Sequence, residues 1–89
     1  MEEWKEHWIK RDTIQQGYIL STIKPFFMNW YGPYETALVT RNWLGESYKI
    51  LEGYETLEEA LIGHEKYKIM TVEEIEELPD AEPKYKGRL

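Results

Sequence analysis

Short runs of apolar residues, bounded by glycine and proline, predict β-strands in the first two thirds of the chain. After Gly17, the run "YILSTIK" is rich in β-branched and aromatic residues and predicts a strand over Tyr18–Lys24, because Pro25 cannot donate a ladder hydrogen bond. Two further runs predict strands over Glu35–Trp43 and Ser47–Tyr54. The short connection "LGES" between them indicates a β-hairpin.

The pattern changes to a helical period after Tyr54. Thr56 is a good N-cap residue, and Glu59 three positions later completes a capping box, so we predict a helix over Leu57–Lys68. The same signal recurs at Thr71 and Glu74 and predicts a short second helix that ends at Pro79.

The two ends of the chain are less regular. Trp4 and Trp8 lie one helical turn apart, which favours a short amphipathic helix over residues 2–10, with a strand as the alternative. Residues 79–89 contain two prolines, a glycine and few apolar groups, so we expect a flexible tail after a single domain over residues 1–78.

These elements together predict an α+β fold. We expect a small antiparallel sheet of three strands, with the Leu57–Lys68 helix packed across one face and short helices at both ends. A chain of 89 residues suits one domain, and 42% hydrophobic and 15% aromatic residues are enough to form a core.

Charge and composition narrow the classes of function. A formal net charge of −6 argues against binding nucleic acid through its phosphates, although imitation of nucleic acid is a minor alternative. The absence of cysteine excludes disulfides and thiolate metal sites. The charged N-terminus and the lack of a long apolar run predict no signal peptide and no membrane span, so we expect a cytoplasmic protein.

One histidine stands on the apolar face of the predicted main helix. His64 shares that face with Leu57, Ala60, Leu61 and Tyr67, and Gly63 beside it allows close approach of another segment. A buried imidazole needs hydrogen-bond partners, and Glu35 and Thr36 at the start of a strand are the best candidates. We favour a structural histidine over a functional one. No ligand spacing supports a metal site with the other histidine, His7.

The segment "FFMNWYGPY" carries five aromatic residues in a predicted loop, namely Phe26, Phe27, Trp30, Tyr31 and Tyr34. A small sheet with one helix cannot bury them all, and exposed Trp and Tyr commonly anchor interfaces. Alternatively, several of them fold back as a lid over the open sheet face. Trp43, Trp4 and Trp8 are candidates for the same surface.

Several short motifs resemble those of a group of small uncharacterised bacteriophage proteins. The matching pieces are Glu35-Thr36 at the start of a strand, Tyr54-x-Thr56, and a helix with Ala60-x-x-Gly63-His64. The resemblance covers about residues 18–70. It implies a phage origin and action on a host component, and it carries no known activity.

We therefore expect a non-enzymatic binding protein that engages a host protein or its own copies through the aromatic surface. The expected binding residues are Trp30, Tyr31, Tyr34, Trp43, His64 and Glu35. One alternative is an oligomeric small-ligand binder, in which aromatic rings stack on a base and His64 or Arg41 contacts an anion. The other is an enzyme that uses Glu35 and His64 as a pair. No cofactor, metal, nucleic acid or membrane is expected.

Overall fold

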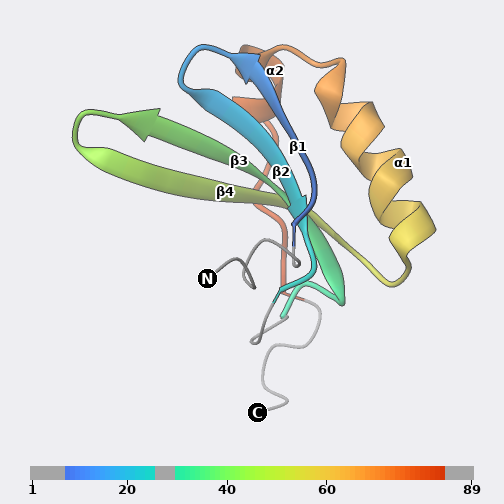
Figure 1. Ribbon diagram of the computed structural model, residues 1–89. Coiled ribbons are helices and arrows are strands. Elements are labelled where there is room, and N and C mark those ends of the chain that lie inside the picture. Colours follow the sequence, from blue (N-terminus) through green and yellow to red (C-terminus); the bar gives the residue numbers. More distant parts are fainter. Residues whose placement is uncertain (1–7, 26–29, 84–89) are drawn as a thin grey trace.

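The computed structural model describes residues 8–25 and 30–83 and shows a four-stranded antiparallel sheet with helices on one face (Figure 1). The strands follow one another in space in their chain order, as a meander: β1 (Trp8–Gln15), β2 (Tyr18–Ile23), β3 (Tyr34–Asn42) and β4 (Gly45–Tyr54). Two helices follow, α1 (Leu57–Lys68) and α2 (Val72–Glu76). The α+β class is confirmed, but the prediction of three strands is wrong.

The additional strand is β1. It begins at Trp8, so residues 8–10, which we predicted as the end of a helix, are extended, and residues 1–7 lie outside the described part of the chain. β1 pairs with β2 through a register interrupted twice, between Trp8 and Lys10 and between Thr13 and Gln15. These irregularities break the alternation of polar and apolar residues, which explains why the sequence pattern did not indicate a strand.

The other three strands lie where we predicted them, to within two residues. The β3–β4 hairpin turns at Trp43 and Leu44, and Gly45 after them has φ +133°. A register shift between Thr36 and Ala37 in the β3–β4 pair leaves Leu51 in β4 without an opposite residue. Leu51 and its neighbour Glu52 consequently both interact with the helix side of the sheet.

Both helices begin with the capping boxes expected from the sequence. Thr56 accepts from the Glu59 amide at 3.1 Å, and Thr71 accepts from the Glu74 amide at 3.1 Å. In each case the glutamate side chain accepts in return from the N-cap amide. α1 has the predicted bounds, and α2 is a single short segment that ends three residues before Pro79.

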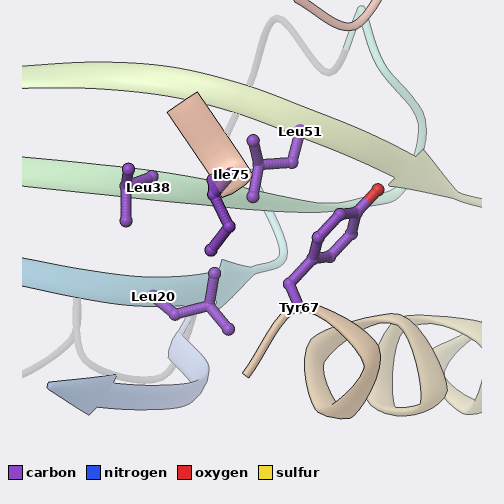
Figure 2. Close-up of a cluster of buried hydrophobic side chains, with 5 residues drawn as sticks. All are labelled: Leu20, Leu38, Leu51, Tyr67 and Ile75. Carbon is purple, nitrogen blue, oxygen red and sulfur yellow. The ribbon is translucent and has the colours of Figure 1, made fainter. Parts of the chain in front are cut away.

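The hydrophobic core lies between the helices and one face of the sheet. Figure 2 shows its buried side chains converging from β2, β3, β4, α1 and α2, namely Leu20, Leu38, Leu51, Tyr67 and Ile75. Leu20 and Leu38 are opposite each other in the β2–β3 register. Burial of such aliphatic side chains, worth roughly 1.5–3 kcal/mol each, is the main force that holds α1 and α2 on the sheet.

The chain after α2 returns along the outer edge of β4. The Ala81 amide donates to the Ile50 carbonyl at 3.1 Å, and Asp80 lies 3.7 Å from the Lys49 ammonium. Lys49 also donates to the Leu78 and Glu76 carbonyls near the end of α2. Asp80 and Ala81 of the predicted tail therefore contact the domain, and residues 84–89 lie outside the described part. Among the described helices, none is long and apolar enough to span a bilayer.

Candidate functional site

The two faces of the sheet have different surroundings, and strand alternation decides which side chain meets which. In β3, Thr36 and Leu38 point to the helices, whereas Glu35, Ala37 and Val39 line the opposite face. We call these the covered face and the open face. The residues that we predicted for one site are divided between them.

A chain of buried hydrogen bonds crosses the covered face. His64 of α1 is fully buried, and its Nε2 lies 2.8 Å from the Asp12 carboxylate of β1. Its Nδ1 lies 2.7 Å from the Thr22 hydroxyl of β2, and that hydroxyl lies 2.5 Å from the Thr36 hydroxyl of β3. One side chain of the helix is thereby connected to three strands.

The chemistry of these four groups decides which of them donates and which accepts in each hydrogen bond. The Asp12 carboxylate only accepts, so His64 Nε2 carries the proton and donates to it. In a neutral ring, Nδ1 then accepts from Thr22, which in turn accepts from Thr36. The hydrogen bond from His64 is the main reason that the pKa of Asp12 is lowered; desolvation opposes it, and the Lys68 charge adds to it.

This arrangement corrects part of the prediction for His64. Thr36 does belong to its hydrogen-bonded chain, through Thr22, but Glu35 lies on the open face and does not contact the imidazole. Neighbouring residues of a strand point to opposite faces, so both could not have been partners. Asp12 and Thr22 instead contact the two nitrogens of the fully buried imidazole. The geometry gives the Glu35–His64 enzyme no support and favours a structural histidine.

Gly63 allows the close approach that we expected beside His64. A methyl group at Gly63 would overlap the hydroxyl and ring of Tyr54, which lies at the end of β4. Burial raises the pKa of the Tyr54 phenol to about 12, although Thr36 nearby lowers it in part. The hydroxyl forms no hydrogen bond of acceptable geometry within the described residues. Tyr54 therefore acts mainly through packing.

The open face contains a cavity with a volume of about 660 Å³. Side chains of all four strands line it: Trp8, Arg11, Ser21, Ile23, Glu35, Ala37, Val39, Arg41, Glu46, Tyr48 and Ile50. We call this cavity the trough. Its floor is made of small or β-branched side chains that are nearly buried, Ser21, Ala37 and Val39, and larger side chains form its rim.

Two arginines and a tyrosine give the rim its polar character. Arg41 forms an ion pair with Glu46, which also accepts from the Tyr48 hydroxyl at 2.8 Å. These hydrogen bonds, from Tyr48 first and Arg41 second, lower the pKa of Glu46. The Arg11 guanidinium stacks on the Trp8 ring at 4.2 Å, and its buried Nε has no hydrogen-bond partner in the described part of the chain.

Glu35 is the unpaired acid of the trough. Its side chain is half-buried, and among the described residues it forms neither a hydrogen bond nor an ion pair. Desolvation by burial raises the pKa of this carboxyl, and no neighbouring charge offsets that effect. Glu35 lies opposite Gly53 of β4, and a side chain at Gly53 would overlap the Tyr31 carbonyl.

The aromatic residues that we assigned to one surface lie at two ends of the sheet. Trp30 is 36% exposed, and Tyr31 and Tyr34 are half-buried, all before or at the start of β3. Trp43 follows the other end of that nine-residue strand, roughly 27 Å away at about 3.4 Å per residue, and is 90% exposed. Trp8 belongs to the Trp30 end. Trp4, Phe26 and Phe27 lie outside the described residues.

Sequence reasoning missed several residues of these two sites. Asp12 and Arg11 belong to the strand that was not predicted, and Tyr48 was included in a strand without a role. The alternation within β1 places Arg11 on the open face and Asp12 on the covered face. A prediction of that strand from "WIKRDTIQ" would have been enough to assign both.

Comparisons with known proteins identify no relative of this chain. The chain matches no protein-family model, and neither curated proteins nor solved structures give a match. The resemblance to bacteriophage proteins stays a prediction. Within residues 8–25 and 30–83, no group of three or more His, Asp or Glu side chains is arranged to hold a metal ion.

Proposed function

We propose that the chain is a non-enzymatic binding protein that engages another protein through the trough and the adjacent β3–β4 hairpin tip. The observation that carries this proposal is the exposure of two large apolar neighbours at that tip. Trp43 is 90% exposed and Leu44 is 75% exposed, and Arg41 and Glu46 of the same hairpin line the trough. Tryptophans in such positions often contribute much of an interface's binding energy.

The proposed surface joins an apolar floor to a polar rim, as binding interfaces commonly do. Ala37, Val39 and Ile50 supply apolar contact area, and the ion pair of Arg41 with Glu46 leaves little net charge at that end. The predicted interface was centred on Trp30 and Tyr31. The exposure of Trp43 favours the opposite end of β3 instead.

Either a host protein or a second copy of the chain is a suitable partner for this surface. The phage resemblance favours a host protein, and self-association is the alternative. Light scattering after size exclusion separates them. A dimer that becomes a monomer in Trp43→Ala indicates self-association, whereas monomers of both proteins direct the search to capture from a host lysate.

Three variants test the surface in either case. Trp43→Ala and Tyr48→Ala, both at exposed positions of the hairpin, should reduce partner binding at least about tenfold, the loss typical of an interface anchor. Ile69→Ala removes a side chain that is 85% exposed beyond α1 and should leave binding unchanged. Equal binding by all three variants would contradict the proposed surface.

A small-ligand binder is the second candidate, because the trough has the size of a small-molecule site. Such sites usually enclose about 300–1,000 Å³, and Trp8 and Tyr48 offer rings for stacking. Arg41 lines the trough as this hypothesis requires, but His64 is buried on the other face. A rise in melting temperature with nucleotides, lost in Tyr48→Ala, would favour this candidate over a protein partner.

A further inference from the structure

We propose that the trough receives a basic side chain of the protein partner, whose aliphatic stem lies on the apolar floor and whose cationic head pairs with Glu35. This inference rests on the proposed function and adds the chemistry of the partner to it. Lysine and arginine both have this combination of a long apolar stem and a charged end.

The first argument is that Glu35 has an unsatisfied charge. A half-buried carboxylate without a hydrogen-bond or ion-pair partner in the described residues has lost water without compensation. A bound ammonium or guanidinium group would restore a charge-assisted hydrogen bond there. Because the carboxylate lines the trough, a side chain that enters the trough can reach it.

The second argument concerns the arginines that share the trough. The charge of Arg41 is balanced by its ion pair with Glu46. The Arg11 guanidinium is stacked on the Trp8 ring and acts electrostatically on Glu46 and Tyr48. The Glu35 end of the trough therefore stays available to a cation.

The third argument is the apolar path that leads to the carboxylate. Ala37 and Val39 follow Glu35 on the same face of β3, and Ile23 lies opposite Glu35 on β2. These side chains present no polar group to a methylene stem. At longer range, the net charge of −6 attracts a basic partner and accelerates its association.

Three six-carbon probes test this chemistry on the full chain by amide chemical-shift titration. Hexylammonium imitates a lysine side chain, hexanol is its uncharged control, and hexanoate tests whether Arg11 makes the trough select an anion. We expect hexylammonium to shift the amides of Ala37, Val39 and Ile50, with a Kd about fivefold lower than that of hexanol, the effect of one partly exposed ion pair.

Two variants make the assignment specific. Glu35→Gln should remove the preference for hexylammonium, and the variant should fold because the amide has nearly the shape of the carboxyl. Glu58→Gln, at an exposed position in the first turn of α1, removes one negative charge just as Glu35→Gln does and should keep the preference.

The outcomes separate this inference from the proposed function. Equal binding of hexylammonium and hexanol in the trough, or tightest binding of hexanoate, would overturn the role of Glu35 and leave the trough as a docking surface. If no probe shifts the trough amides, the inference is wrong and the proposed binding surface loses its support as well.

Discussion

The covered and open faces of the sheet differ in whether their buried polar groups have hydrogen-bond partners. On the covered face, Asp12 and His64 are joined to each other and to two threonines, and the Tyr54 hydroxyl against Gly63 is the exception without a hydrogen-bond partner in the described chain. On the open face, Glu35 and the Nε of Arg11 are buried in part or in full without partners in the described chain. Partnered polar groups favour a structural role, whereas unpartnered ones favour contact with another molecule.

Strand alternation produces this contrast from adjacent residues. Glu35 and Thr36 follow each other in β3, as Arg11 and Asp12 do in β1, and in each pair one member belongs to each face. A substitution on one face can therefore be compared with a substitution one or two residues away on the other.

Truncation of the core should give the largest contrast between the faces. Leu38→Ala opens a cavity on the covered face, where the side chain is 2% exposed, and should lower the free energy of unfolding by about 2–5 kcal/mol. Ile50→Ala on the half-buried open face should cost roughly 1 kcal/mol. Urea unfolding measures both. Equal losses would show that the open face is packed in the same way as the core.

Loss of the histidine should come next. His64→Ala leaves Asp12 and Thr22 without their ring partner and should lower the free energy of unfolding by roughly 1–3 kcal/mol. In the Asp12→Asn background the loss should be smaller, because part of the interaction is already absent. Near-native stability of His64→Ala would reopen a functional role for this residue.

A methyl group at Gly63 should separate α1 from β4. Gly63→Ala overlaps Tyr54, and this overpacking should outweigh the helix propensity of alanine and cost about 1–2 kcal/mol overall. In a Tyr54→Leu background the same change should be neutral or stabilising. Thermal unfolding of the four proteins checks this, and a penalty that persists without the tyrosine ring would refute the packing explanation.

The pH dependence of stability should have opposite signs on the two faces. The pKa of Asp12 is lowered by His64, so its contribution is present above the unfolded pKa of about 4 and is lost as pH falls below it. The pKa of Glu35 is raised by burial, so stability falls as pH rises from about 4 through the folded pKa.

Two variants separate these contributions in urea unfolding between acid and neutral pH. Asp12→Asn should reduce the loss of stability in acid, and Glu35→Gln should increase stability at neutral pH. If Glu35→Gln destabilises the protein at neutral pH instead, the carboxylate has a partner that the described residues do not include.

The smallest effect is expected at the hairpin tip. Trp43→Ala removes a side chain that is 90% exposed and should change the free energy of unfolding by no more than about 0.5 kcal/mol. The large effect on binding and the small effect on stability would together identify an interface residue. A substantial loss of stability would mean that Trp43 packs within the monomer.

Local signals made much of the fold predictable. The capping boxes at Thr56 and Thr71 located both helix starts, and the hairpin connection located β3 and β4. These features depend on residues a few positions apart. β1 was missed because its charged, twice-bulged sequence hides the period of two, and the error changed the sheet from four strands to three.

The site was harder to predict because it depends on pairing between distant strands. The helical period of the sequence predicted that His64 faces the sheet, but its partner Asp12 lies in the strand that was not predicted. The trough requires side chains of all four strands, so a three-stranded sheet could not reveal it. Trp43 was recognised as an interface candidate, but the distance between it and Trp30 follows only from the extended β3.

The link between Asp12 and His64 also has a consequence for the order of folding. It joins residues 52 positions apart, whereas each of the two hairpins closes through a two-residue turn. Short loops close at a lower entropic cost than long ones, so we expect the hairpins to form before this hydrogen bond. Removal of this hydrogen bond should then accelerate unfolding more than it slows refolding. During unfolding, we expect α1 to separate from the sheet before α2 does.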